Sequence, residues 1–374
     1  MWLAYPVQIF GTSDVNHHFT MTMMAVGPSE NTRFYEKVFN CLRTLGYIPQ
    51  YIMADGSRSV TAAQQIVFPE SVRLMCYAHV HRRVKVNLPK AYPLAVRSRI
   101  LGDIEILRRC RSQEEFVAAA KLMLASWPAP TSKFKKYMLD TWINGSENLW
   151  FDGASPYIVN NNGLESCNKQ IKEKHTLRKR LEFSVFLKRA EEAVSYRSKA
   201  MRVTPELPTD YEIAPHQFKA AYQMISGPDS PNCTTARFPV SGEICFVMAT
   251  SNNCNASKDE LLAGLQESFE QASSWEDFKR RRYLVNVVKE SALSPTHFVC
   301  SCHYGSGKNA CMHSVAVMCA PGTALRQYPP DARAAPLVHV SKKRGRPKKS
   351  ASQTQLAVGG RPANAPKQNR HAAN

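Results

Sequence analysis

Three cysteines and one histidine crowd a short window near the end of the chain. The stretch VCSCHYGSGKNACMHSV places Cys300, Cys302, Cys311 and His313 as a Cys-x-Cys pair and a Cys-x-His pair. Three thiolates and one imidazole are the soft and borderline ligands that suit tetrahedral Zn²⁺. Because four protein ligands leave no open position for water, we predict a structural zinc site and no metal-assisted hydrolysis there. The competing explanations are a chance gathering of buried cysteines, or His303 and Cys319 as alternative ligands.

The elements around this window suit such a site. RYLVNVVKES and THFVCSC are predicted to form a strand hairpin that delivers the first ligand pair. CMHSVAVMC predicts a short helix that delivers the second pair, with HYGSGKNA as the loop between them. We therefore expect a small ββα zinc-binding domain over residues 281–322.

Two acidic residues stand where metal-binding carboxylates are often found. Asp55 ends the predicted strand YIMAD, and Glu165 lies in the first turn of a helix predicted from about Leu164. The carboxyl end of a strand in an α/β sheet is exposed yet anchored, and carboxylate oxygens suit hard divalent cations. The simpler alternatives are that Asp55 caps the following helix and that Glu165 marks an ordinary helix start.

Strand and helix patterns alternate around these acids over residues 1 to about 90. YPVQIFGTSD and HFTMTMMAVG predict an antiparallel hairpin with a turn around Asp14 and Asn16. SENTRFYEKVFNCLRTLGY and SVTAAQQIVFPE predict helices, and RLMCYAHV predicts a further strand. The first helix is expected to be amphipathic, with Phe34, Val38, Leu42 and Leu45 on its apolar face. Apolar residues at three- and four-residue spacing then predict a helical region over about 91–150.

The charge of the chain indicates an anionic partner. The 374 residues carry 49 Lys and Arg against 30 Asp and Glu, a formal net charge of +19. Such an excess repels itself unless something anionic offsets it, so nucleic acid is the expected partner. No apolar run reaches the eighteen or so residues that a membrane span requires, and we expect an intracellular protein whose thiols are free for metal.

The basic excess is concentrated at the C-terminal end. No acidic residue follows Asp331, so we expect 332–374 to be a disordered basic tail. Within it, RGRP resembles the core of an AT-hook, in which Gly permits close approach to the minor groove and Pro keeps the chain extended. A nuclear import signal is the alternative, and either one predicts a nuclear location. The candidate DNA-binding residues are Lys342, Lys343, Arg344, Gly345, Arg346, Pro347, Lys348 and Lys349.

Two family resemblances follow from these motifs. Cys-x-Cys, a gap and Cys-x-His after a hairpin resemble the SWIM zinc finger, a module associated with DNA or protein binding that often follows a transposase domain. MADGSRSVTAAQQIVFPES, RLMCYAHVHRRVKVNL and the later NNNGLESCNKQIK resemble Mutator-like element (MULE) transposases, over residues 1 to about 200. This resemblance implies a ribonuclease H-like mixed sheet with an inserted helical region, and an acidic set that binds two Mg²⁺ ions for DNA strand cleavage. It assigns Asp55 as the second acid and Glu165 as the third, and gives Cys76 and His79 a structural role.

One part of the family pattern is missing. In the family, the first Asp ends a strand that precedes the segment matching LAYPVQIFGTSD, and the sequence begins at Met1, too late to contain it. We therefore expect an N-terminally truncated sheet and no DNA cleavage by the chain as written. The functions that remain are a truncated or decayed transposase, a domesticated DNA-binding regulator, or a zinc-stabilised protein-interaction module. Residues 201–280 are assigned only as a linker and accessory region.

Overall fold

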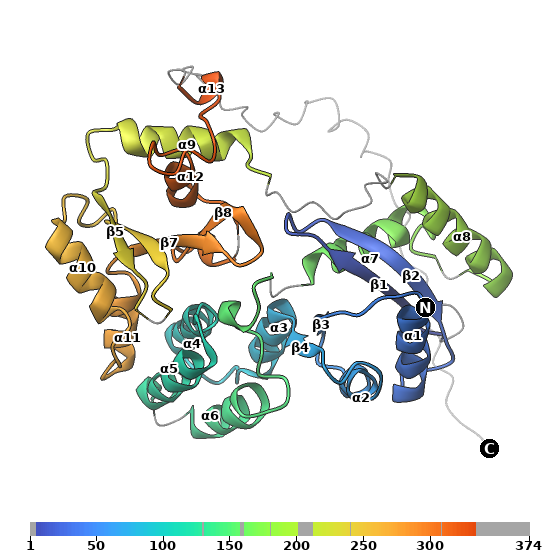
Figure 1. Ribbon diagram of the computed structural model, residues 1–374. Helices are drawn as coiled ribbons and strands as arrows, with labels where there is room; N and C mark the ends of the chain where they lie inside the picture. Colours follow the sequence, from blue (N-terminus) through green and yellow to red (C-terminus); the bar gives the residue numbers. More distant parts are fainter. Residues whose placement is uncertain are drawn as a thin grey trace, which may run out of the picture. The chain divides into compact units, whose positions relative to one another are not determined.

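The computed structural model describes most of the first 333 residues, which are coloured from blue to red along the sequence in Figure 1. The described ranges are 5–128, 131–157, 161–179, 181–200, 212–239, 241–307 and 309–333. Within them the chain is a mixed α/β protein with three separate small sheets. The single ribonuclease H-like sheet that the family resemblance implies is not one of these three, and it remains a prediction.

The N-terminal hairpin is confirmed. Strands β1 (Val7–Ser13) and β2 (Phe19–Val26) pair antiparallel, with an irregularity between Phe10 and Gly11. Asp14 closes the turn, because its Oδ1 accepts the backbone N–H groups of Asn16 at 2.9 Å and His18 at 2.8 Å. Asp14 is thus a turn residue here.

Helix α1 (Thr32–Thr44) forms as expected, with a different buried face. Its N-cap is Asn31, whose side chain accepts the Phe34 N–H, and its buried residues are Tyr35, Val38 and Phe39. Leu45, expected on the apolar face, is 64% exposed, because it is the C-cap and lies beyond the last full turn.

The acid-bearing turn follows a pair of parallel strands. Strands β3 (Tyr51–Ala54) and β4 (Val72–Met75) are joined by helix α2 (Arg58–Val67), which packs against α1 in a shared apolar core. The prediction of one strand across RLMCYAHV is wrong after Met75. Cys76 is instead the N-cap of helix α3 (Tyr77–Asn87), whose Tyr77, Val80 and Val84 are buried at helical spacing.

A helical region follows, as predicted. Helices α4 (Leu94–Leu107), α5 (Gln113–Ser126) and α6 (Ser132–Met138), with a π-helical turn at Leu139–Ile143, enclose a tryptophan-rich core. A 3₁₀ turn at Asp152–Ala154 leads toward helix α7 (Asn162–Lys174) and then α8 (Phe183–Ala200). Helix α7 buries Cys167 and Ile171 against Ile9 and Met21 of the β1–β2 hairpin.

The segment assigned as linker and accessory region holds several further elements. They are α9 (Pro215–Ser226), β5 (Cys233–Arg237), β6 (Ile244–Met248), α10 (Lys258–Glu267) and α11 (Trp275–Arg282). Helix α11 joins the helical region: the indole N–H groups of Trp275 and Trp127 both donate to the buried carboxylate of Asp103, at 2.7 and 2.9 Å. Residues 201–211 lie outside the described residues.

The predicted hairpin and helix of the zinc-binding domain are both present. Strands β7 (Asn286–Ser291) and β8 (Ser294–Cys300) extend an antiparallel sheet in the order β5-β6-β7-β8 (Figure 1). Helix α12 (Met312–Met318) packs on this sheet through Val315 and Met318, and a short α13 (Pro330–Arg333) follows. None of the helices in the described ranges is both long and apolar enough to cross a membrane.

Candidate metal centre and acidic site

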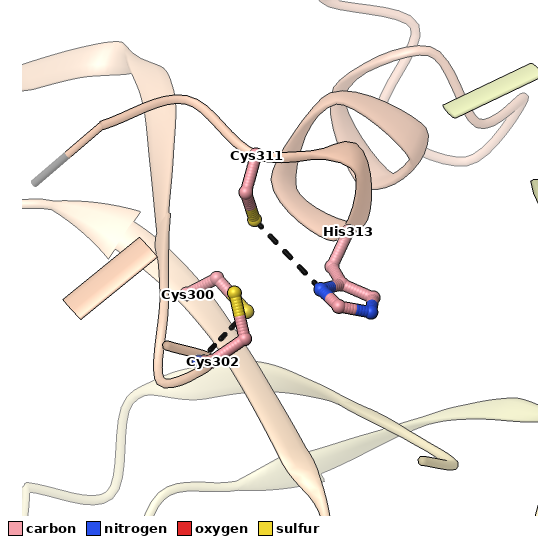
Figure 2. Close-up of side chains that lie close together, drawn as sticks. All are labelled: Cys300, Cys302, Cys311 and His313. Carbon is pink, nitrogen blue, oxygen red and sulfur yellow. Dashed lines mark hydrogen bonds between the residues drawn. The ribbon is translucent and has the colours of Figure 1, made fainter. Parts of the chain in front are cut away.

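The four predicted zinc ligands converge. The ligand atoms of Cys300, Cys302, Cys311 and His313 all lie within 4.8 Å of one another. Cys300 ends β8, Cys302 lies in the following turn, and Cys311 and His313 belong to the N-terminal turn of α12 (Figure 2). Among the described residues, this is the one group of three or more Cys, His, Asp or Glu side chains that could share a metal ion.

Backbone amides point at the sulfur atoms of this cluster. Cys300 Sγ accepts the N–H of Cys302 at 3.4 Å, and Cys302 Sγ accepts the N–H of Gly305 at 3.2 Å. Cys311 Sγ accepts the N–H of Ser314 at 3.5 Å. Hydrogen bonds of this kind favour the thiolate, which is the form that binds metal.

Gly305 is required by the turn that carries Cys302. A Cβ atom at residue 305 would lie 2.6 Å from the carbonyl oxygen of Cys300 and 2.7 Å from its Cβ. Any larger residue would push the turn away from the end of β8, and with it the first ligand pair.

His313 presents its two ring nitrogens to different partners. Nδ1 lies 3.8 Å from Cys311 Sγ and therefore faces the cluster, while Nε2 lies 3.4 Å from Asn286 Nδ2 at the start of β7. Nδ1 is therefore the ring nitrogen that faces the predicted metal site, and Asn286 lies against the opposite side of the ring.

Protons in the cluster are shared unevenly. Hydrogen bonds from Cys300 and Cys302 hold the pKa of Cys311 well below its usual range, and hydrogen bonding to Cys302 and Cys311 raises the pKa of Cys300. Burial lowers the pKa of His313, but its hydrogen bonds with Cys302 and Cys311 outweigh burial and raise the value to about 9. The protons of the neighbouring thiols and imidazole thus already stabilise a thiolate at Cys311. A divalent cation at the same place would stabilise it more strongly.

The donor set fits a structural zinc ion. Three sulfur atoms and one imidazole nitrogen complete a tetrahedral sphere without water. The alternative ligands fall outside the group: Cys319 is the C-cap of α12, and His303 lines a cavity of about 190 Å³ with Arg108 and Arg109.

Asp55 lies in the exposed turn directly after β3. It does not cap the next helix, because the N-cap of α2 is Ser57. The sequence did not single out a second carboxylate at this turn: Glu147 Oε2 lies only 2.9 Å from where a Cβ atom on Gly56 would be. Because Gly56 has no side chain, the Glu147 carboxylate can approach the turn that carries Asp55. The Asp-Gly pair is the only sequence signal of this contact.

Arg73 lies beneath the same turn. It is 8% exposed, and its guanidinium donates to the backbone carbonyl oxygens of Ala54 and Asp55. Burial lowers the pKa of Arg73, while the negative charges of Glu147 and Asp55 oppose that shift. An arginine inside the short strand VRLM is a sequence signal of a nearby anionic group.

Glu165 lies in the first turn of α7, as predicted. Its Oε1 is 3.5 Å from His79 Nε2 and its Oε2 is 3.7 Å from Arg82 Nη2, both on α3. Asn160, which precedes this helix in the NNNGLES segment, lies outside the described residues.

Cys76 links the segments that carry the two acids. Its backbone N–H donates to the Ala54 carbonyl at 3.0 Å, next to Asp55, and its Sγ accepts the Asn161 N–H at 3.3 Å, at the start of α7. Burial raises the pKa of the Cys76 thiol, so it stays protonated. Cys76 therefore acts at this site through hydrogen bonding, and His79 through its contact with Glu165.

The acidic residues do not make a two-metal centre by themselves. Around Asp55 and Glu165, the described residues form no group of three converging ligands. Two Mg²⁺ ions are normally held by several carboxylates that bridge them.

The comparisons with known proteins support the transposase resemblance of the N-terminal part of the chain. Residues 16–183 match the family model described as "Transposase, Mutator family". A search of curated proteins found no match to the chain. The matched range contains Asp55, Cys76, His79 and Glu165 and ends before α9. Residues 16–183 are thus similar to the transposase domain of the Mutator family.

Proposed function

We propose that this chain is a transposase-derived, zinc-stabilised DNA-binding protein of the MULE and SWIM type. The observation that carries the proposal is the match of residues 16–183 to the Mutator transposase family, since proteins of that class act on DNA. The converging Cys₃His group supports a SWIM-type finger C-terminal to that domain. The net charge of +19 supports an anionic partner.

The zinc ion has a structural role in this proposal. Its four ligands tie the end of β8 to the start of α12, two elements that otherwise meet through a small apolar core. Bound zinc would supply folding free energy to this part of the sheet.

Strand cleavage is not part of the proposed function of the residues described. Asp55 and Glu165 would serve as metal ligands only within a larger acidic set, and the structure gives them cationic or backbone partners instead. A DNA-binding role without cleavage agrees with the basic charge and with the zinc-finger geometry. Nuclear location is part of the same proposal.

The test measures duplex DNA binding by the full chain and by a variant lacking 342–349, a segment outside the described residues. We expect the full chain to bind, and the deletion to weaken binding and to flatten its salt dependence, since each lost phosphate contact lowers the slope of log K against log salt by about 0.9. Fluorescence anisotropy from about 50 to 200 mM salt measures both quantities. Failure of the full chain to bind any duplex would sink the proposed function. An unchanged slope would remove the segment 342–349 from the interface.

A further inference from the structure

A second basic surface lies on the transposase-like part of the chain, next to Glu165. Arg82 and Lys85 are exposed on α3, and Lys169 and Lys172 are exposed on α7. We propose that these four side chains, the α3–α7 face, bind the phosphate backbone of duplex DNA. The inference rests on the proposed DNA-binding function and names a surface for it.

The two helices meet at a contact that sets the position of this face. Arg82 Nη2 lies 3.7 Å from Glu165 Oε2, which joins the middle of α3 to the first turn of α7. Lys85 is three residues beyond Arg82 on the same side of α3. Lys169 and Lys172 are four and seven residues beyond Glu165, which places both on the Glu165 side of α7. The four cations therefore extend along two helix faces from one shared point.

Few negative charges offset these cations. The chain has no acidic residue between Glu70 and Asp103, a stretch that contains all of α3. Glu165 contacts Arg82 and His79, and Glu173 of α7, whose charge also acts on Lys169 one turn away, forms a 2.5 Å ion pair with Arg178. Lys85, Lys169 and Lys172 form no ion pair among the residues that the structure describes. Such cations are free to replace the counterions of a phosphate backbone.

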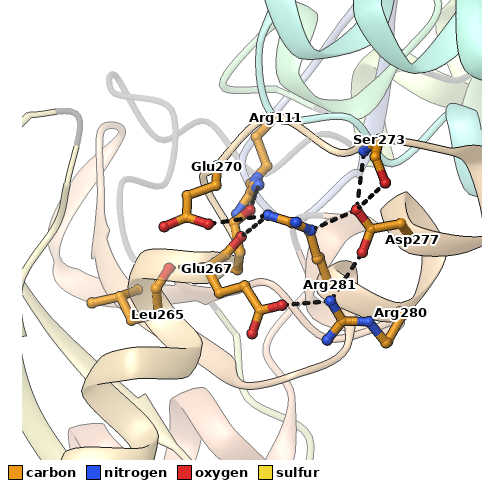
Figure 3. A network of polar contacts seen from close by, with 9 residues as sticks. Arg111, Leu265, Glu267, Glu270, Ser273, Asp277, Arg280 and Arg281 are labelled. Atoms are coloured by element: carbon orange, nitrogen blue, oxygen red, sulfur yellow. Dashed lines mark hydrogen bonds and ion pairs between the residues drawn. The ribbon is translucent and has the colours of Figure 1, made fainter.

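The most basic run of the chain before the tail behaves differently. Lys279, Arg280, Arg281 and Arg282 lie in the last turn of α11, and each forms an ion pair with an acidic side chain. Figure 3 shows the pairs of Arg280 and Arg281. Arg281 binds Asp277 at 2.9 Å and Glu270 at 3.3 Å, and Arg280 binds Asp277 at 2.9 Å as well as Glu267. Hydrogen bonds from Arg281 and from the Ser273 backbone hold the pKa of Asp277 well below its usual range, so these pairs persist at acidic pH. The α11 run therefore stabilises the fold and offers little free charge to DNA.

The placement of the α3–α7 face favours DNA over another polyanion. It borders Glu165 and, through Cys76, the turn of Asp55, and all of these residues lie in the range that matches a transposase family. A phosphate backbone bound along it would pass beside Glu165. Lysines at three-residue spacing suit a regularly charged rod and need no base contacts.

The experiment replaces three lysines in the full chain and compares salt dependence. Lys85→Gln, Lys169→Gln and Lys172→Gln are combined, and Arg82 is kept because it also contacts Glu165. Losing three phosphate contacts should lower the slope of log K against log salt by about 2.7. The ratio of wild-type to variant affinity should therefore fall about 40-fold between 50 and 200 mM salt. The matched control combines Lys121→Gln, Lys133→Gln and Lys136→Gln, three exposed lysines of the helical region that change the net charge equally.

The outcomes separate this inference from the proposed function. A shallower slope in the α3–α7 variant, with the control close to wild type, supports the face. Equal slopes in all three proteins overturn it and leave DNA binding to other residues. If the wild type itself binds no duplex, the proposed function fails first. Lys→Arg replacement at the same three positions preserves the charge and should therefore preserve the salt slope. If the slope falls in this variant as well, the change reflects a folding defect, and the proposal that these charges bind phosphate is overturned.

Discussion

The Cys/His centre and the acid-bearing site differ in how their side chains are brought together. The four predicted zinc ligands lie within fourteen consecutive residues, on one strand end, one turn and one helix start, and their ligand atoms converge within 4.8 Å. Asp55 and Glu165 are 110 residues apart in sequence and sit on separate elements with different partners. Cys76 connects their segments through two hydrogen bonds, and no third ligand joins them in the described residues.

This difference shows what each site needs in order to form. The finger ligands depend on local turn geometry, with backbone N–H groups already aimed at sulfur. A carboxylate centre depends on the packing of distant strands and helices. Here Asp55 follows a strand of the β3–β4 sheet, while Glu165 lies on α7, which packs against the separate β1–β2 sheet. We therefore expect changes in the Cys/His centre to affect folding strongly and changes in the acids to affect it weakly.

The largest expected effect comes from losing one zinc ligand. Cys302→Ser should reduce bound zinc from about one ion per chain to none and unfold the β7–β8–α12 part, because structural zinc contributes on the order of 10 kcal/mol to small zinc-binding domains. Metal analysis of the purified chain and thermal unfolding with and without chelator measure both effects. Cys319→Ser is the matched control, since this partly buried cysteine lies outside the ligand group. Retention of zinc by Cys302→Ser would contradict the assignment.

The same contrast explains which predictions from the sequence succeeded. Cys-x-Cys and Cys-x-His spacing, strand alternation in FVCSC and helical spacing in CMHSVAVM all lie within a few residues of the ligands, so ligand convergence and the ββα order were predictable. The hairpin β1–β2 was predictable for the same reason, from two alternating runs and a turn at Asp14.

The errors concern features that depend on distant contacts. The strand predicted across RLMCYAHV ends at Met75 because Cys76 turns the chain, donating to Ala54 and accepting from Asn161, which lies 85 residues away. The position of Glu147 near Asp55 was not predicted, because its only local signal in the sequence is the glycine at position 56. Helix α11 was left within an accessory region, although Trp275 completes the helical core by donating to Asp103, 172 residues before it. No local spacing encodes these pairings.

An intermediate effect is expected at the link between the two acid-bearing segments. Cys76→Ala leaves the Asn161 N–H without its buried acceptor and opens a small void, because Cys76 is fully buried. The free energy of unfolding should fall by about 1–3 kcal/mol. Chemical denaturation measures this loss, and faster hydrogen exchange at the Asn161 amide locates it. Cys41→Ala removes an exposed thiol and should change neither quantity. Equal behaviour of the two variants would show that Cys76 does not hold these segments together.

The smallest effect on stability is expected from the acids themselves. The Asp55 side chain lies in an exposed turn, and the ion pairs of Glu165 are long and 39% exposed on the Glu165 side, so solvent screens them. Asp55→Asn and Glu165→Gln should each change the free energy of unfolding by no more than about 0.5 kcal/mol, as Glu36→Gln on α1 should. Titration with Mn²⁺ makes the comparison sharper, because two unjoined carboxylates should bind it only weakly and the variants should differ little from wild type. If the wild type binds Mn²⁺ tightly and stoichiometrically and both variants abolish that binding, Asp55 and Glu165 converge on one ion. The Cys/His centre and the acid-bearing site would then not differ in the way described.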